Sequence, residues 1–264
     1  MAPVDTIVVI PAYNPGRFLR RALKSVQAQT YEGWRLLVVD DGSTEDVSRH
    51  FPPDLDAGRL QLVRHPSNLG QSTALNTALA RVETPFLAQL DADDWFLPNT
   101  LERLHQYLEA APPEVALVSA NLKTVFSNGR RPLYSRGAAF SERLEFLLAN
   151  RSVWPRFYRT AALKSVGGWP LDGPYGGRYL EDKQVLYRLI ERYRFGWVDE
   201  TLYVHRRHAH NQTLRRREYN RVTCWAVEEA LRRWGGAYHP VFSQTRTGWL
   251  KVDRLVPAAP SSTG

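Results

Sequence analysis

Apolar runs and amphipathic segments alternate along the first half of the chain. The β-branched run at 6–13 is followed by segment 16–29, where apolar residues recur every three to four positions, as on one face of a helix. This alternation continues to about residue 122. It predicts strands at 6–13, 34–41, 60–65, 85–92 and 115–122, helices at 16–29, 72–82 and 98–111, and a segment at 42–51 that opens with capping residues.

Continuous apolar strands separated by amphipathic helices are typical of an open, mostly parallel sheet with helices on both faces. Ligands of such sheets bind at the carboxyl ends of the strands. Three predicted strands end in polar clusters, which are PAYN at 11–14, DDGS at 40–43 and DADD at 91–94. We therefore expect the functional site at these strand ends.

The pattern loosens after residue 125, where glycine, proline and arginine become frequent. Helices are predicted at 141–149, 159–165, 180–193 and 215–234, and a strand at 201–208 leads into a basic loop. The small, polar residues at the C-terminus predict a disordered tail.

Composition places the chain among ordinary globular proteins. With 264 residues, 43% of them hydrophobic, and eight tryptophans, it can bury a sizeable core. Its one cysteine, Cys224, excludes an intrachain disulfide and fits a reducing compartment. The N-terminus does not resemble a signal peptide, and no apolar stretch approaches the roughly 20 residues of a spanning helix. These features predict a cytoplasmic protein.

The formal net charge of +8 indicates attraction to anions such as nucleotide phosphates, nucleic acid or an acidic membrane surface. Basic residues concentrate at 205–208 and 214–221. A solvated helix face is the simpler interpretation of segment 214–221. Docking against anionic lipid or a lipid-linked acceptor, peripheral to the inner face of a membrane, is the alternative.

Three carboxylates, Asp91, Asp93 and Asp94, are crowded into four positions where a buried strand ends. Their repulsion is relieved either in a solvated turn or by a cation. The chain has neither a G-x-G-x-x-G loop after its first strand nor a Walker loop, which argues against a dinucleotide site or a P-loop. Mg²⁺ and Mn²⁺ bind one or two carboxylates together with substrate phosphates, so a metal–diphosphate site is a candidate.

Seven motifs occur in an order that makes the chain resemble a known family. They are VIPAYN (9–14), VVDDGS (38–43), NLGQSTALN (68–76), LDADDWFLP (90–98), VGGW (166–169), LEDKQVLYRL (180–189) and RRHAHNQT (206–213). Over residues 4 to 213 the chain is similar to the inverting family 2 glycosyltransferases, which use nucleotide-diphospho-sugars. The resemblance implies the α/β GT-A fold, with a Rossmann-like, mostly parallel central sheet flanked by helices and a small acceptor-side subregion.

The resemblance also implies a division of the chain. Residues 1–213 would form the catalytic domain, with the nucleotide sugar bound by 1–125 and the acceptor by 126–213. Residues 214–264 would form a C-terminal helical extension with a flexible tail.

Site roles follow from the resemblance, residue by residue. The implied nucleotide-sugar contacts are Pro11, Tyr13, Asn14, Asp40, Asp41, Asn76, Asp91, Ala92 and Asp93. Pro11, Tyr13 and Asp41 would surround the base, with Asp41 accepting from a ring N–H. Asp93 would bind Mn²⁺ or Mg²⁺ with His208 and Asp91, although His205 and His210 lie close to His208 in the sequence.

Asp182 matches the catalytic base of the family, and Glu181 is the competing candidate. Arg206 or Arg207 would contact the diphosphate, whereas Asp94 is expected to be structural. Trp169 is either a core residue or, after its flexible Gly-Gly pair, a platform that stacks on a sugar. One departure from the common family pattern is Leu75, which replaces an arginine in the helix after the third strand.

The implied reaction is the transfer of one sugar from a nucleotide diphosphate sugar, by default UDP-linked, to an acceptor hydroxyl. The acceptor would be a carbohydrate or lipid-linked molecule in cell-surface polysaccharide or glycoconjugate synthesis. A carboxylate takes the acceptor proton, and one direct displacement inverts the anomeric centre. The alternatives are a phosphohydrolase of the haloacid dehalogenase type and a non-catalytic nucleotide-binding protein. Nucleic acid is not expected as a partner, because acidic clusters repel phosphate unless a metal intervenes.

Overall fold

The computed structural model describes residues 3–208 and 215–258. In the first half, apolar strands and amphipathic helices alternate. The elements are β1 Thr6–Ala12, α1 Phe18–Gln27, β2 Trp34–Asp40, β3 Leu60–Arg64, α2 Gln71–Leu79, β4 Phe86–Gln89, β5 Trp95–Phe96, α3 Thr100–Ala110 and β6 Val115–Phe126. The capped segment after β2 forms only a 3-10 turn, η1 Val47–His50, and a second turn, η2 Ala57–Arg59, precedes β3.

Among the described residues, the second half contains the longest strand, β9, and the longest helix, α7. Its elements are β7 Leu133–Ser135, α4 Arg143–Ala149, β8 Arg156–Arg159, α5 Thr160–Ser165, α6 Glu181–Leu189, β9 Arg194–Arg207, α7 Arg216–Arg233, β10 Tyr238–Gln244 and β11 Leu250–Pro257. All four helices predicted here are present. The expected strand at 201–208 is the second half of β9.

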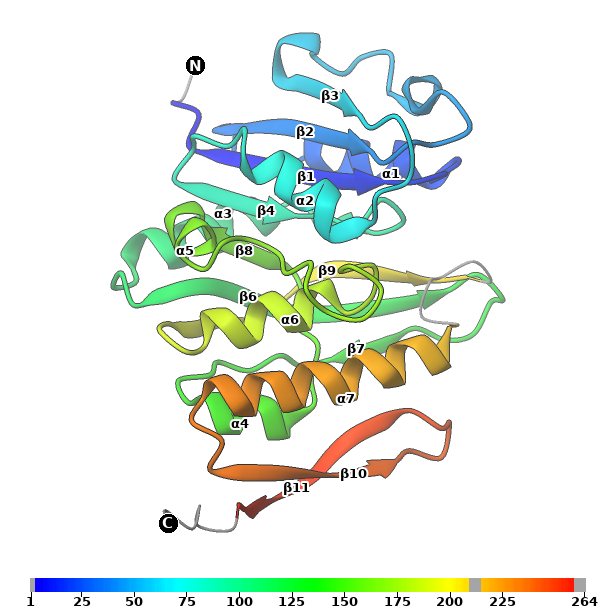
Figure 1. Ribbon diagram of the computed structural model, residues 1–264. Coiled ribbons are helices and arrows are strands. Elements are labelled where there is room, and N and C mark those ends of the chain that lie inside the picture. The colour runs from blue at the N-terminus through cyan, green and yellow to red at the C-terminus, as the bar shows by residue number, and fades with distance from the viewer. Residues whose placement is uncertain (1–2, 209–214, 259–264) are drawn as a thin grey trace.

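One sheet runs through most of the molecule in the order β3-β2-β1-β4-β8-β6-β9-β5, with β7 beside β6 (Figure 1). The four strands from β3 to β4 are parallel. Strand β8 lies antiparallel between β4 and β6, and β6 pairs with β9 in parallel. The predicted α/β class and Rossmann-like sheet are therefore confirmed, and the two predicted halves, 1–125 and 126–213, share one sheet.

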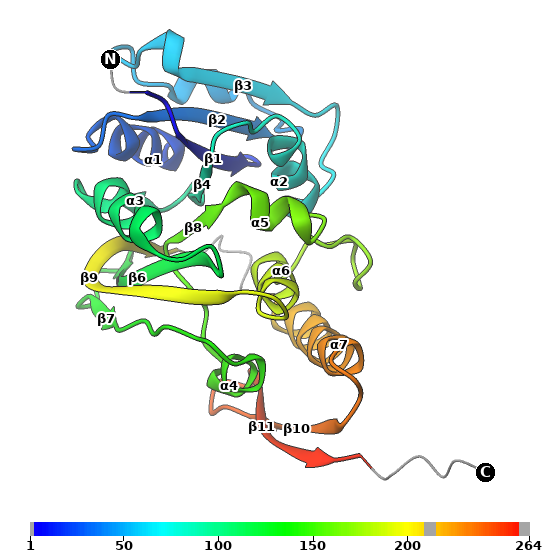
Figure 2. The ribbon, with the colours of Figure 1, turned by 90° about the vertical axis from the view of Figure 1, so that its left-hand side faces the viewer.

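Helices cover both faces of the sheet, as continuous apolar strands require (Figure 2). On one face, α1 and α3 bury residues such as Leu23 and Leu104 against β1, β2 and β4. On the other face, α2, α5, α6 and α7 form a second apolar cluster that includes Leu75, Leu163 and Leu186. The central strands β1, β2 and β4 are therefore largely shielded from water on both sides.

The C-terminal region differs from the expected helical extension with a flexible tail. After α7, strands β10 and β11 form an antiparallel hairpin beside α7 and α4 (Figure 1). Val252 of β11 and Ala230 of α7 belong to the same buried cluster as the central sheet. The hairpin is therefore part of the fold, and only residues 259–264 of the predicted tail lie outside the described residues.

The carboxyl ends of β1, β2 and β4 point toward the same edge of the sheet, on the right in Figure 1. Ala12 at the end of β1 is directly opposite Asp40 at the end of β2. The three polar clusters of the sequence are thus brought together at this edge. Within the described residues, no helix combines the length and apolar character needed to cross a bilayer.

Candidate active site

The loops after β1 and β2 hold each other through hydrogen bonds. The backbone N–H of Asn14 donates to Ser43 Oγ at 2.8 Å, and the Thr44 N–H donates to Asn14 Oδ1 at 2.9 Å. Asn14 has a left-handed backbone, with φ of 45°, which asparagine tolerates better than most residues. Tyr13 is 47% exposed beside this junction, so its ring is accessible from the sheet edge.

Asp40 and Asp41 are both buried and contact their own chain. Asp40 accepts a hydrogen bond from the Ser43 N–H at 2.9 Å, and its other oxygen lies 3.3 Å from Arg64 Nε. Asp41 lies 2.8 Å from His65 Nδ1 and accepts the N–H groups of Leu69 and Gly70 at 2.9 and 2.8 Å. Both oxygens of Asp41 therefore position the loop that leads into α2. Its contact with a nucleobase stays a prediction.

Gly42 allows the DDGS loop to approach the loop before α2. Its φ is 72°, and a Cβ at this position would lie 2.3 Å from the carbonyl carbon of Ser67. A larger residue would be strained and would also push these loops apart.

The turn after β4 is anchored to β9 through Asp94. Its carboxylate accepts from Tyr203 Oη and from the Arg206 N–H, both at 2.7 Å. Burial raises the pKa of Asp94 well above its usual range, and the neighbouring Asp93 and Asp91 add to this effect. Asp94 is therefore structural, as expected, and it fixes the turn that presents Asp91 and Asp93.

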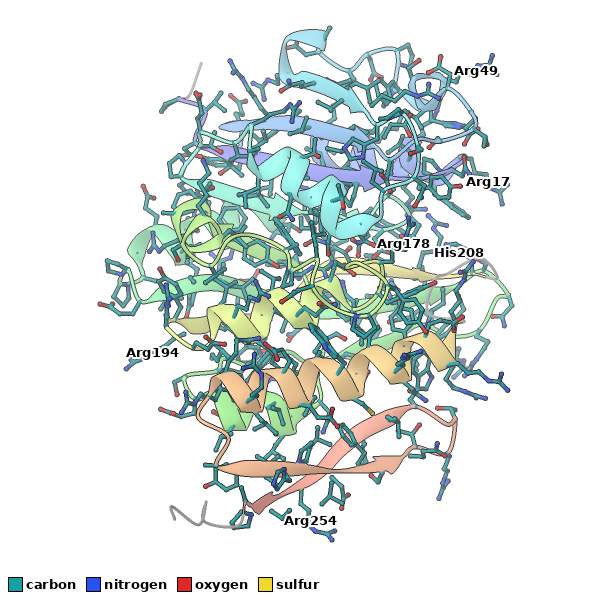
Figure 3. All side chains as sticks on the ribbon, in the orientation of Figure 1. Arg17, Arg49, Arg178, Arg194, His208 and Arg254 are labelled. Atoms are coloured by element: carbon teal, nitrogen blue, oxygen red, sulfur yellow. The ribbon has the colours of Figure 1, made fainter. Side chains whose placement is uncertain are left out.

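His208, rather than His205, is the described histidine that reaches Asp93. Its Nε2 lies 2.9 Å from Asp93 Oδ2, and its ring packs on Phe18 with centroids 4.7 Å apart. His205 instead stacks on Trp154, and His210 lies outside the described residues. Figure 3 labels His208 at the same edge as Arg17, which follows β1.

Arg206 packs its guanidinium between two aromatic rings. The guanidinium carbon lies 4.8 Å from the ring centroids of both Phe18 and Trp95, and Nε donates to the Asp93 carbonyl at 3.1 Å. These contacts hold the carboxylate turn against α1 and β9. Arg207 is exposed, and the diphosphate contact proposed for either arginine stays a prediction.

Arg156 at the start of β8 is the site residue that sequence reasoning missed. Its side chain is 2% exposed, and its guanidinium lies between two carboxylates. Nη2 donates to Asp91 Oδ2 at 2.9 Å, and Nη1 lies 3.2 Å from Asp182 Oδ2. An arginine within the apolar run that precedes α5 is the only sequence signal for this role.

The candidate base Asp182 lies in the first turn of α6. Its Oδ1 accepts the Lys183 N–H at 2.8 Å, while Oδ2 faces Arg156. Burial raises the pKa of the adjacent Glu181 to about 8, and the charge of Asp182 adds to the shift. Burial thus favours the protonated form of Glu181, whereas Asp182 has a direct cationic partner in Arg156. The assignment of Asp182 as the base stays a prediction.

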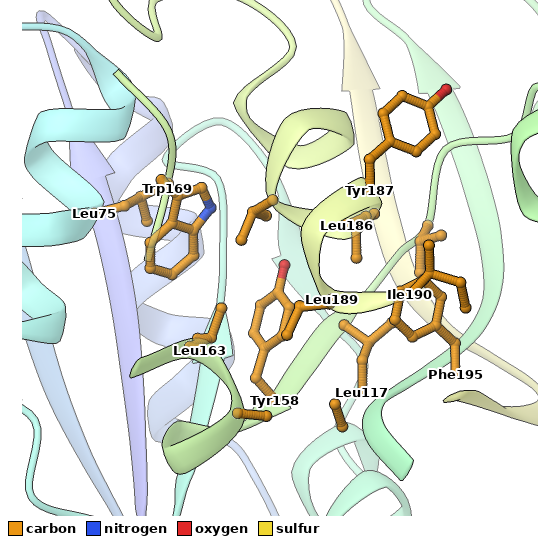
Figure 4. Close-up of a cluster of buried hydrophobic side chains, with 14 of the residues drawn as sticks. Leu75, Leu117, Tyr158, Leu163, Trp169, Leu186, Tyr187, Leu189, Ile190 and Phe195 are labelled. Carbon is orange, nitrogen blue, oxygen red and sulfur yellow. The ribbon is translucent and has the colours of Figure 1, made fainter. Parts of the chain in front are cut away.

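The structure places Trp169 in the core, which corrects the alternative of a sugar platform. The side chain is 1% exposed and packs among Leu75, Tyr158 and Leu163 (Figure 4). Leu75, which replaces the arginine common in the family, is fully buried in this cluster. Neither residue is accessible to a ligand.

Asn76 holds the backbone of Trp169, and its predicted contact with the nucleotide sugar stays a prediction. Its Nδ2 donates to the Trp169 carbonyl at 2.7 Å, and its Oδ1 accepts the Trp169 N–H at 2.8 Å. Gly168 is needed at this junction, because its φ is 72° and a Cβ would lie 2.4 Å from Asn76 Oδ1. Both amide atoms of Asn76 are thus used to position the loop before α6.

The donor set near Asp93 fits a divalent cation that is completed by its substrate. Within residues 3–208 and 215–258, no group of three or more His, Cys, Asp or Glu side chains forms a metal cage. Asp93 and His208 nevertheless supply one carboxylate and one imidazole at 2.9 Å from each other. Mn²⁺ and Mg²⁺ commonly take few protein ligands and fill the remainder with phosphate and water.

Comparisons with known proteins agree with this fold. The family model described as "Glycosyl transferase family 2" matches residues 7–167. The chain therefore belongs to glycosyl transferase family 2.

Similar curated proteins are named for sugar transfer or polysaccharide biosynthesis, and each match covers less than two thirds of the relative's own length. The succinoglycan biosynthesis protein ExoU of Rhizobium meliloti is 39% identical over 39% of this chain and 30% of its own length. The glycosyltransferase GlyA of Streptococcus pneumoniae is 27% identical over 75% of this chain and 28% of its own length. The Escherichia coli UDP-Glc:alpha-D-GlcNAc-diphosphoundecaprenol beta-1,3-glucosyltransferase WfgD is 36% identical over 36% of this chain and 37% of its own length.

Two solved structures support the GT-A fold. Residues 1–349 of S. aureus TarS in complex with UDP-GlcNAc match with a TM-score of 0.67, 20% identity and coverage of 86% of this chain and 66% of that one. The mannosyltransferase PcManGT of Pyrobaculum calidifontis, in complex with GDP-Man and Mn²⁺, matches with a TM-score of 0.65, 20% identity and coverage of 88% and 65%.

Proposed function

We propose that the chain transfers one sugar from a nucleotide diphosphate sugar to an acceptor hydroxyl with inversion of the anomeric centre. The observation that carries this proposal is the convergence of two segments distant in sequence. Asp182 of α6 and Asp91 of the turn after β4 contact the same buried guanidinium of Arg156. A carboxylate that can accept a proton thus lies beside the strand ends where a diphosphate would bind.

Asp182 would remove the acceptor proton as the hydroxyl oxygen attacks the anomeric carbon. A bond forms between these two atoms, the bond from the anomeric carbon to the phosphate oxygen breaks, and the proton passes to Asp182. One displacement needs no second carboxylate as nucleophile. Because Glu181 holds its proton in the neutral range, it would act as a hydrogen-bond donor to the acceptor.

Asp93 and His208 would hold the divalent cation, and Asp91 would lie next to it. When bound, the cation would neutralise the charge of the departing diphosphate. The Mn²⁺ in the structure of PcManGT supports this assignment. The carbonyl of Asp93 and the indole of Trp95 already position Arg206 at the same turn, within reach of an anionic group.

The donor is proposed to be UDP-linked, because TarS and WfgD are named with UDP-sugars. The proposed acceptor is a carbohydrate or lipid-linked molecule in surface polysaccharide or glycoconjugate synthesis, in line with ExoU and WfgD. Arg215 and Arg216 at the start of α7 donate to Tyr179 Oη and to the Thr247 carbonyl. These contacts favour a structural role for the basic segment, and its contact with anionic lipid stays a prediction.

The haloacid dehalogenase alternative is not supported, because the carboxylate turn follows β4 rather than β1 and the family is that of glycosyltransferases.

A turnover assay tests the proposal. UDP-Glc, UDP-GlcNAc and GDP-Man are incubated with Mn²⁺, and release of the nucleoside diphosphate is followed for the wild type and Asp182→Asn. We expect one donor to be cleaved and Asp182→Asn to lose about 10²–10⁴-fold in kcat while still binding the donor. A β-configured product from an α-linked donor, seen by proton NMR, would support inversion, and retention would contradict it.

A further inference from the structure

Arg156 is a buried cation at the junction between the proposed donor and acceptor sides. Arg156 belongs to β8, which lies between β4 and β6 in the middle of the sheet. A buried charge costs several kcal/mol unless it is paired. Asp91 and Asp182 supply the pairing, at 2.9 and 3.2 Å.

The partners of Arg156 distinguish it from an ordinary core ion pair. Asp91 is 23% and Asp182 10% exposed, so both carboxylates have one side on the buried guanidinium and part of their surface toward solvent. Arg156 Nε has no hydrogen-bond partner within the described residues, so the side chain keeps an unsatisfied donor while serving both acids. A hydrophobic residue of similar size would avoid both the burial of a charge and the unsatisfied N–H donor.

The charge of Arg156 is maintained by the same neighbours. Burial alone would lower the pKa of the guanidinium, but the charges of Asp91 and Asp182, with smaller contributions from Tyr158 and Glu181, outweigh burial and raise it. The planar guanidinium also offers two N–H arms in a fixed relation, which a lysine ammonium cannot reproduce. Arg156 therefore sets the separation and orientation of two carboxylates as well as offsetting their repulsion.

We propose that Arg156 is a positioning residue that holds Asp182 in register with Asp91, so that the base and the donor-binding turn share one geometry. This inference rests on the function proposed above. Arg156 would act on turnover through Asp182 and on donor affinity through Asp91. It would not touch either substrate.

Arg156→Met removes the charge at similar length, and Arg159→Met is the matched control. Arg159 lies at the other end of β8 and donates to the carbonyls of Leu108, Ala111 and Val115, away from the site. Hydrolysis is measured with UDP-Glc, UDP-GlcNAc and GDP-Man as donors. Mn²⁺-dependent binding is measured with UDP. We expect Arg156→Met to lower kcat by about 10–100-fold and Arg159→Met to change it less than about twofold, although both lower the melting temperature.

Arg156→Lys and the double variant Arg156→Met/Asp182→Asn separate positioning from general destabilisation. Arg156→Lys keeps the charge and should recover part of the lost kcat. If Arg156 acts through Asp182, the double variant will have the kcat of Asp182→Asn alone.

The outcomes are separable. If the wild type neither binds nor hydrolyses any probe, the proposed function is wrong and the inference is lost with it. If the wild type is active and Arg156→Met matches Arg159→Met in kcat, or if the effects of Arg156→Met and Asp182→Asn multiply in the double variant, the positioning role is wrong while the function stands.

Discussion

Glu181→Gln tests the electrostatics of the acidic pair at the start of α6. Glu181 is 7% exposed, and no other side chain within the described residues donates a hydrogen bond to it. Arg156 pairs with Asp91 and Asp182, and no ion pair to Glu181 is formed within the described residues. Burial and the charge of Asp182 therefore raise its pKa from 4.5 to about 8.

The sign of the resulting pH dependence follows from linkage. Between pH 4.5 and 8 the folded state binds the Glu181 proton and the unfolded state does not, so stability falls as pH rises through this window. A difference of this size in pKa corresponds to on the order of 5 kcal/mol. Glutamine cannot ionise, so the stability of Glu181→Gln relative to the wild type should increase by a few kcal/mol between pH 5 and pH 9.

Urea unfolding at pH 5, 7 and 9 measures this difference, with Glu145→Gln as the control. Glu145 also lies in the first turn of a helix, α4, but it is exposed. Its substitution should leave the difference from the wild type constant across pH. If Glu181→Gln behaves like Glu145→Gln, or if its advantage shrinks as pH rises, the account of Glu181 as a buried protonated acid is wrong.

Three further substitutions test the assignments of neighbouring residues. Trp169→Ala should lower the free energy of unfolding by about 3–5 kcal/mol and the melting temperature by roughly 10 °C, without weakening donor binding by the folded protein. An unchanged melting temperature with weakened donor binding would restore the sugar-platform interpretation. Asn76→Ala should cost about 1–3 kcal/mol in urea unfolding, because two hydrogen bonds to Trp169 are lost, and an unchanged stability would contradict this. His208→Ala should weaken Mn²⁺-dependent UDP binding at least about tenfold in calorimetry, whereas His205→Ala should not, and equal effects would remove the preference for His208.

The sequence predicts the first half of the fold well because its elements have clear periodicity. Segment 16–29 places Leu19, Ala22, Leu23 and Val26 on one face, and all four are buried in α1. Strand β8 is not predicted from the sequence, because it has four residues, follows a proline and contains two arginines. Strand β10 reads as irregular for similar reasons, since it contains a proline and a histidine.

The site is only partly readable from sequence, because its contacts join distant segments. The three carboxylates at 91–94 indicate a site at the end of β4, but nothing local to Arg156 shows that its partners are Asp91 and Asp182. Trp169 follows two glycines, which suggests an exposed loop. In the folded chain the amide of Asn76 draws that loop onto the core. Such long-range pairing has no signature in periodicity or composition.

Calorimetric titration of UDP and GDP, with and without Mn²⁺, tests the central claim most directly. The wild type should bind one nucleotide at least about tenfold more tightly with Mn²⁺, and Asp93→Asn should lose that gain while keeping its melting temperature within a few degrees. If neither nucleotide binds, or if Asp93→Asn retains the full effect of Mn²⁺, the turn after β4 does not hold a metal–diphosphate complex and the proposed site is wrong.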